Sequence, residues 1–249
     1  LREGERETEG RVAVVGAGAT TPGIAVDVAG TSDVLLVCTD APYIHPDMAV
    51  VTNPHPLGRS WLVGGATGVT GGAVRQLLGY LGSDMSDLSF STLEREAMEL
   101  PVGSEGLQCV TLLSGDRAPH WNPEMRGAWV GLTPRHKSAH LYRAVQEGAA
   151  YTVRALLDAV RAIGVTVNEL ICTGGGAKSI LGMSIRADIT ELRVRVSPNI
   201  EASSIGGALL SALSVGDRQA KELASELTRS ATSIDPDASR MASYRREFS

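Results

Sequence analysis

The glycine-rich segment TGGGAKS, residues 173–179, limits what this chain can fold into more than any other feature. It follows a short apolar run at 170–172 and precedes a segment with a helical pattern that reaches Asp188. A turn of this kind between a strand and a helix can bring backbone N–H groups against a phosphate or a nucleotide. One such loop is a weak signal, but glycines also gather at 16–18, 30–32 and 64–72.

Composition narrows the class of protein. The 249 residues suffice for one large domain, and a hydrophobic content of 43% supports a sizeable core. A formal net charge of −5 argues against binding nucleic acid through its phosphates. The three cysteines lie far apart and predict neither a disulfide framework nor a zinc site. No apolar run has the length of a membrane span, so we expect a cytoplasmic protein without membrane contact.

The apolar pattern predicts an α/β fold. The clearest helix has Ser138 as its expected N-cap and ends before Gly164, with apolar residues at every third or fourth position. Residues 1–11 are charged and without a pattern, and we expect them to form an irregular or disordered tail. Further strands are predicted at 24–28, 34–38, 110–113, 169–172 and 192–196, and further helices at 73–80, 93–99, 180–187 and 205–213.

The segment VAVVGAGATTPG, residues 12–23, imitates the glycine fingerprint of dinucleotide-binding proteins, with Asp40 at about the right distance of twenty residues. That fingerprint needs a helix after its last glycine, whereas residues 24–30 alternate like a strand and end in another turn. We therefore interpret the segment as a tight turn at the edge of the fold. A Rossmann-type protein that binds NAD therefore ranks third among the possible functions, after the two given at the end of this subsection.

Several motifs point together to one family. GDRAPHWNP at 115–123 is followed by MRGAWVGL at 125–132, and HLYRAVQEG at 140–148 opens the long helix. With the GTS turn at 30–32, the GGGAKS loop, and Glu201 followed by GGA, they resemble the C-terminal half of the FGGY family of carbohydrate kinases. The resemblance extends over residues 12–249 and implies a ribonuclease-H-like lobe, as in actin and Hsp70, with a mixed sheet, flanking helices and ATP in the cleft beside a second lobe.

The resemblance also implies the residues of the site. Thr31, with Gly30 and Ser32, would place a hydroxyl and backbone N–H groups at the terminal phosphates, where charge develops in phosphoryl transfer. In the later loop, glycines would let the backbone lie against the adenosine, where a Cβ would clash. Mg²⁺ would be held chiefly by phosphates and water, so no protein metal site is expected. The implied ATP-binding residues are Gly30, Thr31, Ser32, Gly72, Gln76, Gly174, Gly175, Gly176 and Ser179.

Some positions depart from the family pattern. The family's catalytic base is an aspartate about twenty-one residues before the GTS glycine, which takes the proton of the sugar hydroxyl. That spacing leads to Glu9, whose neighbours do not match the family's pattern, so the catalytic residue is unassigned and Glu9 is its candidate. Gly182 and Ser184 stand where the family often has Trp and Gln. Arg117 can bridge its loop or touch a ligand, and the sequence favours the structural role.

We therefore expect half of an ATP-dependent kinase that phosphorylates a sugar or polyol hydroxyl. The form of the GDRAPHWNP motif favours a pentulose such as xylulose. The family's sugar-binding N-terminal lobe does not occur in this sequence, so we expect the chain alone to lack turnover. The alternative is a non-catalytic ATP-binding or assembly module, in which an exposed cleft face would favour a homodimer.

Overall fold

The computed structural model describes residues 3–80, 87–216, 222–223, 226 and 232–248. The strands of this part are β1 Ile24–Ala29, β2 Ser32–Thr39, β3 Val51–Pro54, β4 Trp61–Val69, β5 Gln108–Val110, β6 Ala128–Val130, β7 Glu169–Thr173, β8 Arg193–Val196 and β9 Thr232–Ile234. Its helices are α1 Glu3–Gly16, α2 Gly71–Tyr80, α3 Asp87–Met98, α4 Ser138–Ala162, α5 Ile180–Thr190, α6 Ala202–Ser214 and α8 Ala238–Phe248. Two short 3₁₀ turns, η1 Ser104–Gly106 and η2 Gly175–Lys178, complete the set.

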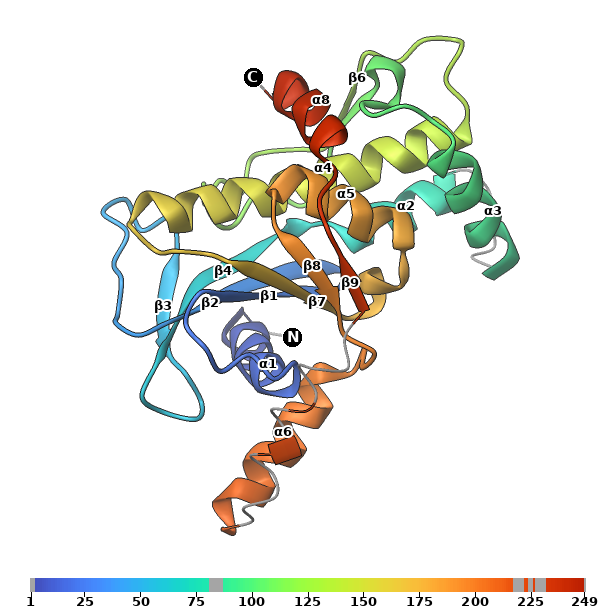
Figure 1. Cartoon of the computed structure of the whole chain (residues 1–249). Coiled ribbons are helices and arrows are strands. Elements are labelled where there is room, and N and C mark those ends of the chain that lie inside the picture. Colours follow the sequence, from blue (N-terminus) through green and yellow to red (C-terminus); the bar gives the residue numbers. More distant parts are fainter. Residues whose placement is uncertain (1–2, 81–86, 217–221, 224–225, 227–231, 249) are drawn as a thin grey trace.

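A mixed sheet forms the centre of the molecule, with the strand order β3-β4-β2-β1-β7-β8-β9 (Figure 1). β7 pairs in parallel with both β1 and β8, and the other neighbours pair antiparallel. In the β1–β7 ladder Val28 lies opposite Thr173, so the two glycine turns that follow these strands meet at one edge of the sheet. The predicted α/β class, with a mixed sheet and flanking helices, is confirmed.

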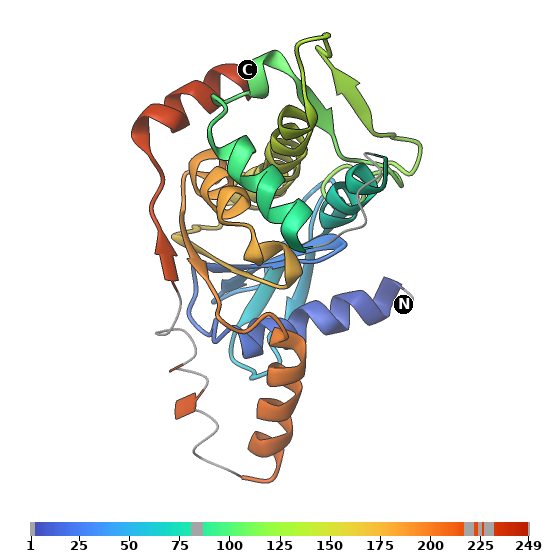
Figure 2. The same ribbon diagram turned by 90° about the vertical axis from the view of Figure 1, so that its right-hand side faces the viewer.

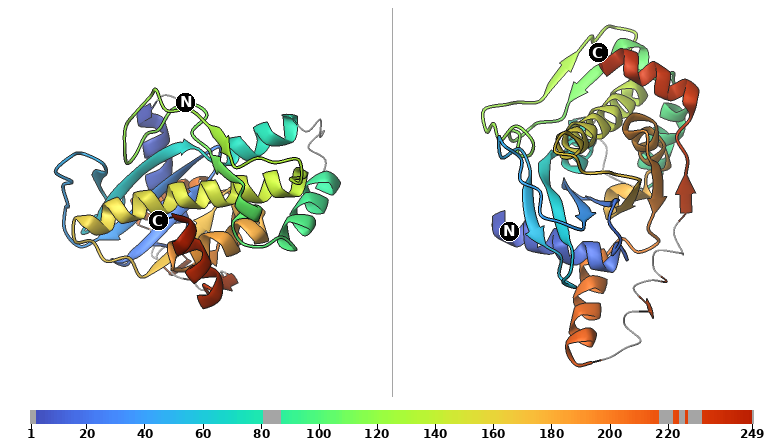
Figure 3. Two further views of the ribbon diagram at one scale, coloured as in Figure 1. Left: turned by 90° about the horizontal axis from the view of Figure 1, so that it is seen from above. Right: turned by 60° about the vertical axis from the view of Figure 1, so that its left-hand side comes forward.

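Side chains of the central strands alternate between two apolar cores, because both faces of the sheet are covered. Leu35 and Val37 of β2 belong to the core beneath α4, whereas Leu36 and Cys38 belong to the core that includes α1. Figure 1 shows α4 and α5 on one face and α1 on the other, and Figure 3 shows α4 lying across the strands. The end of the sheet at which the glycine turns lie is thus packed between helices on both faces.

Helix α1 corrects the predicted irregular tail. Residues 3–16 are helical, so the prediction for 1–11 is wrong from residue 3 onward; residues 1–2 lie outside the described part. Val14 packs against the sheet and Val15 against α6. Burial on two sides makes the apolar residues contiguous, and this pattern imitates a strand. Because the dinucleotide fingerprint needs a strand before its glycines, the helix also excludes the Rossmann alternative.

The contact between α1 and α6 depends on two glycines. A Cβ on Gly16 would lie 1.9 Å from the carbonyl oxygen of Ala202, and one on Gly206 would lie 2.0 Å from that of Val12. No side chain fits at either position, so the backbones of the two helices touch directly. Figure 2 shows α6 extending from this crossing, away from the sheet.

Most other predicted elements are present with shifted ends. The long helix begins at Ser138, but the residue at its N-cap is Lys137 rather than Ser138. All three cysteines are unpaired, and Cys38 and Cys172 are buried. Among the helices of the described residues, none combines the length and the apolar character that a membrane crossing requires.

Candidate functional site

The turn between β1 and β2 is fixed by the start of α2. The carbonyl oxygen of Thr31 accepts hydrogen bonds from the backbone N–H groups of Thr70 (3.1 Å) and Gly72 (3.0 Å). A Cβ on Gly71 would lie 2.2 Å from the oxygen of Gly30, and one on Gly72 would lie 3.0 Å from Cγ2 of Thr31. These glycines allow the helix to approach the turn closely. Gly72 thus supports Thr31.

The second glycine turn contacts the end of β1. Gly174 has a φ of +88°, and a Cβ there would lie 2.7 Å from the carbonyl oxygen of Ala29. Packing against the end of β1 therefore requires glycine at this position, and its predicted contact with adenosine stays a prediction. Gly175 differs, because a Cβ on it would meet no atom within 4 Å. This glycine faces open space.

A cavity of about 400 Å³ lies between the two turns and the helices α2, α3 and α4. We call it the first cavity. Its apolar wall is formed by Val74, Leu78 and Phe90, and the ring of Phe90 is held edge-to-face by Tyr142 at 5.6 Å between centroids. Five of the predicted ATP-binding residues line it: Gly30, Thr31, Gly175, Gly176 and Ser179.

The other predicted residues lie elsewhere. Ser32 faces a neighbouring cavity, and Gly72 and Gly174 pack against the turns as described. Gln76 is exposed and does not line the first cavity, which Arg75 reaches from the same helix. The sequence located the right turns but could not show which residue of each turn faces inward, because that depends on the packing of the two turns on each other.

Ser179 holds the floor of the first cavity in place. Its hydroxyl caps α5 by accepting from the backbone N–H of Gly182 (2.9 Å) and donates to Oε1 of Glu94 (2.8 Å). A Cβ on Gly182 would lie 2.7 Å from Oε1 of Gln146, so the amide of Gln146 fills the space that a larger residue would need. Glycine at position 182, where the family often has Trp, is therefore compatible with the packing of Gln146.

A buried charge cluster forms the back of the first cavity. Arg186 Nε lies 3.0 Å from Asp27 Oδ2, and its Nη2 donates to Asp33 Oδ2. Thr70 Oγ1 donates to the other oxygen of Asp33 at 2.6 Å. The two carboxylates are almost completely buried, at 0% and 1% exposed, and Arg186 is 5% exposed. We call these three charged residues the cavity cluster.

Burial sets the protonation of the cavity cluster. Desolvation, opposed by Arg186 and reinforced by Asp33, raises the pKa of Asp27 to about 7. Desolvation also raises the pKa of Asp33, against the effect of Arg186 and of the hydrogen bond from Thr70. The sequence analysis missed this cluster, although a charged residue inside an apolar strand, as in VDV at 26–28, was a signal.

A second cavity of about 270 Å³ adjoins the first. Gly30 and Thr31 line both, so the β1–β2 turn is the partition between them. The second cavity is also lined by Ser32, by Glu9 of α1 and by Arg117 of the loop before β6. It therefore holds a carboxylate, a hydroxyl and a guanidinium beside the turn. In the part of the chain that the structure describes, no group of three or more His, Cys, Asp or Glu residues could hold a metal ion.

The comparisons with known proteins agree with this arrangement. The family model described as the C-terminal domain of the FGGY family of carbohydrate kinases matches residues 25–215. The mixed sheet with two glycine turns beside one cavity thus belongs to the C-terminal domain of a carbohydrate kinase. The chain belongs to the FGGY family of carbohydrate kinases. The match begins after α1, so Glu9 lies outside it.

Relatives and solved structures of this family cover most of the chain. It is 30% identical to the xylulose kinase of Bacillus subtilis over 161 residues, which is 64% of this chain and 32% of the relative. It is 26% identical to the gluconokinase of the same organism over 96% of this chain and 48% of the relative. The crystal structure of xylulose kinase from Rhodospirillum rubrum matches with a TM-score of 0.83 and 25% identity, over 95% of this chain and 47% of that chain. The chain thus spans no more than about half the length of these proteins.

Proposed function

We propose that this chain is the nucleotide-holding half of an ATP-dependent kinase that phosphorylates a sugar or polyol hydroxyl. One observation carries the proposal: the turn with Gly30 and Thr31 lines two cavities at once. Phosphoryl transfer needs a nucleotide on one side of the transferred group and an acceptor on the other. A shared partition that offers backbone N–H groups and a hydroxyl suits the point where the two substrates meet.

The first cavity fits a nucleotide. Its volume of about 400 Å³ lies within the usual range for small-molecule sites. The apolar wall with Phe90 suits a base, Gly175 leaves room at the floor, and Arg75 supplies a positive charge for phosphates. Mg²⁺ commonly binds to nucleotide phosphates and water, and both oxygens of Asp33 are already engaged by Thr70 and Arg186. Phosphates of the bound nucleotide would hold the ion here.

The second cavity suits the acceptor hydroxyl. Glu9 is the carboxylate beside the partition and fits the role of general base. In the proposed step the acceptor oxygen forms a bond to the γ-phosphorus, and the bond from that phosphorus to the β–γ bridging oxygen breaks. ADP leaves with the bond's electron pair, and the hydroxyl proton passes to the carboxylate of Glu9.

Xylulose is the first substrate to test, because relatives named xylulose kinase match this chain. The sugar would be bound mainly by a second lobe, which the longer relatives have room to contain. We place the enzyme in the cytoplasm, where ATP and such sugars occur. A non-catalytic ATP-binding module would need only the first cavity, so the carboxylate and guanidinium of the second favour the kinase.

The proposal is tested by calorimetry of the chain with Mg·ATP, with NAD as the parallel ligand. We expect saturable binding of ATP and none of NAD. The variant Gly175→Leu should weaken ATP binding by about tenfold or more, about 1.4 kcal/mol, because its side chain enters the first cavity. Gly79→Leu is the matched control, since a Cβ at Gly79 also meets no atom within 4 Å and this residue does not line the cavity.

Three results would contradict the proposal. Binding of NAD without ATP would point to a different cofactor, and absence of ATP binding would remove the nucleotide site. Equal weakening by Gly175→Leu and Gly79→Leu would show that the first cavity is not where ATP binds. Mixing the chain with ATP and xylulose should give no sugar phosphate until an N-terminal lobe is supplied.

A further inference from the structure

We propose that Arg117 binds the terminal phosphoryl group of ATP from the acceptor side and neutralises its charge during transfer. This inference rests on the proposed kinase function and assigns a further residue to the same reaction. Arg117 lines the second cavity together with Thr31, Ser32 and Glu9. It is half-buried, and its loop lies far in the sequence from the other residues of the cavity.

The loop of Arg117 is fixed on both sides of this residue. The backbone N–H of Ala118 donates to the carbonyl oxygen of Ala66 in β4 at 3.1 Å, and that of Asp116 donates to Asn122 at 2.8 Å. Ala118 is fully buried in the core beneath α4. The backbone at Arg117 is thus held to the sheet, as preorganisation of a charged group for catalysis requires.

Two glycines of β4 form the surface on which this loop lies. A Cβ on Gly65 would lie 2.8 Å from Cβ of Ala118, and one on Gly68 would lie 2.9 Å from the carbonyl oxygen of Gly115. Any side chain at either position would push the loop away from the sheet. Gly65 and Gly68 therefore position the Arg117 loop, and they do so without lining either cavity.

Arg117 supplies the positive charge of the second cavity. The guanidinium of Arg186 is offset by the two carboxylates of the cavity cluster. The carboxylate of Asp116 next to Arg117 is engaged within the loop by Nδ1 of His120 at 2.5 Å. Among the described residues that line the second cavity, Arg117 is the one cation. Its charge lies on the opposite side of the Thr31 turn from Arg75, so the two arginines face the two sides of the partition.

The chemistry of the transfer explains what a guanidinium does there. Negative charge is spread over the three equatorial oxygens of the moving phosphoryl group. The planar fork of an arginine can bind two of these oxygens at once. ADP lacks this group, so a contact to it strengthens binding of ATP without affecting ADP.

The test compares Mg·ATP with Mg·ADP by calorimetry on the wild-type chain and its variants. Arg117→Gln should weaken ATP binding by about tenfold and leave ADP binding unchanged. Arg117→Lys, which keeps the charge but loses the fork, should fall between the two. Arg135→Gln removes the same charge from an exposed position outside both cavities and should change neither affinity.

The outcomes separate this inference from the function on which it rests. Suppose that the wild-type chain binds ADP and that Arg117→Gln weakens the affinities for ATP and ADP equally, or weakens neither. Arg117 then only shapes its loop, and this inference is overturned while the proposed function stands. If the wild-type chain binds no nucleotide, the proposed function fails and the inference with it. Should Arg117→Gln melt far below the wild type, Arg117→Lys decides, since an unchanged ratio of ATP to ADP affinity in that folded variant overturns the inference.

Discussion

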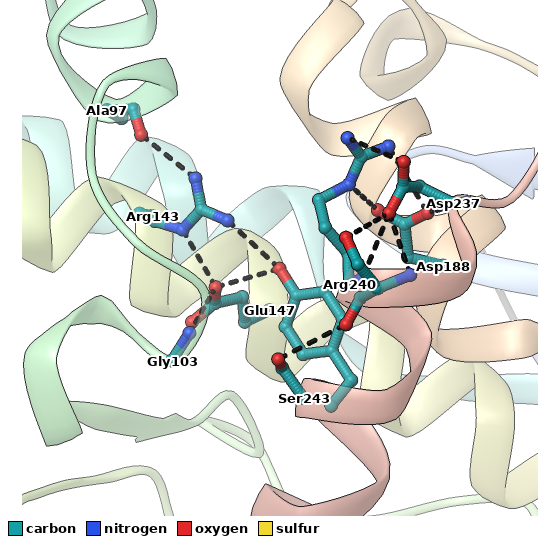
Figure 4. A network of polar contacts seen from close by, with 10 residues as sticks. Ala97, Gly103, Arg143, Glu147, Asp188, Asp237, Arg240 and Ser243 are labelled. Carbon is teal, nitrogen blue, oxygen red and sulfur yellow. Dashed lines mark hydrogen bonds and ion pairs between the residues drawn. The ribbon is translucent and has the colours of Figure 1, made fainter.

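Two buried clusters of this molecule both pair an arginine with carboxylate side chains, but they differ in net formal charge. The cavity cluster has one guanidinium and two carboxylates, and Oδ1 of Asp27 has no hydrogen-bond partner among the described residues. The second cluster lies under α8, where Arg143 faces Glu147 at 2.8 Å and Tyr244 joins them (Figure 4). We call this second group the α8 cluster.

The α8 cluster satisfies its groups with the surrounding backbone. Figure 4 shows Arg143 directed at the carbonyl oxygen of Ala97 and Glu147 at the N–H of Gly103, at 3.0 and 3.1 Å. The hydroxyl of Tyr244 accepts from Arg143 at 3.1 Å and donates to Glu147 at 2.9 Å. One positive and one negative charge cancel, so this cluster can be buried without a further charged partner.

The comparison separates a structural use of buried charge from a functional one. The balanced cluster fastens α8 to α4, and none of its three residues lines the first cavity. The unbalanced cluster keeps an excess carboxylate at the back of the first cavity, where burial raises the pKa of Asp27. Burial also raises the pKa of Glu147, so the two clusters differ in charge balance and in their place relative to the first cavity, and not in the direction of the pKa shift. The following variants are designed to break or sharpen this difference, from the largest expected effect to the smallest.

Removing the guanidinium of the cavity cluster should have the largest effect. Arg186→Leu leaves two buried carboxylates uncompensated and is expected to lower the free energy of unfolding by about 3–5 kcal/mol at pH 8. The loss should be smaller at pH 5, because both carboxyls can then bind protons. Urea denaturation at the two pH values measures this. Arg161→Leu is the control, since Arg161 pairs with Asp158 at the surface and should cost about 1 kcal/mol or less.

Breaking the α8 cluster should destabilise the fold without touching the nucleotide. Arg143→Met leaves Glu147 buried without its cation, and we expect a loss of about 3 kcal/mol in urea denaturation. Affinity for ADP, measured by calorimetry in the folded variant, should equal that of the wild type, whereas Arg186→Leu should reduce it. Equal loss of ADP affinity in both variants would contradict the claim that one cluster is structural and the other functional.

The pH dependence of stability should reveal the protonation of Asp27. Its pKa rises from 3.8 in the unfolded chain to about 7 in the fold, so the folded state binds the proton more tightly. The resulting stabilisation is present below about pH 4 and disappears as the pH rises through 7. Asp27→Asn should therefore flatten the decline in unfolding free energy between pH 4 and 7. Asp47→Asn, in an exposed loop, should keep the wild-type slope; a wild-type slope in Asp27→Asn would contradict this reading.

The smallest change removes one hydroxyl of the α8 cluster. Tyr244→Phe loses the bonds to Arg143 and Glu147 and should lower the free energy of unfolding by about 1–2 kcal/mol. Hydrogen exchange should become faster in α8 before it changes in the sheet. Tyr80→Phe, at a side chain that is 73% exposed, should change neither quantity.

Regular apolar patterns made most of the fold predictable. The alternation in β1 and β2 and the long period of α4 depend on one or two buried faces of a single element, and a sequence records these directly. Helix α1 was not predicted because Val14 and Val15 are buried against different partners. Burial from two sides removes the helical period on which the interpretation depends.

The site was predictable in its turns and not in its details. Thr31 and Gly175 follow strands and were located by the glycine pattern. At Gly72 a Cβ would meet the side chains of Val69 and Thr31, and at Gly174 it would meet the backbone of Ala29, so packing requires glycine at both positions; their contact with ATP stays a prediction. The roles proposed for Arg186 and Arg117 depend on segments distant in the sequence that meet only after folding, so the local pattern could not decide them.

The glycine crossing of α1 and α6 has a consequence for the order in which the site is completed during synthesis. Ser203 of α6 donates to the backbone oxygen of Glu9 at 3.5 Å, so the backbone of α1 at this residue contacts a helix that is synthesised much later. The first cavity needs nothing beyond α5, which supplies Arg186. A growing chain thus has every residue that lines the first cavity before α6 reaches the backbone of Glu9.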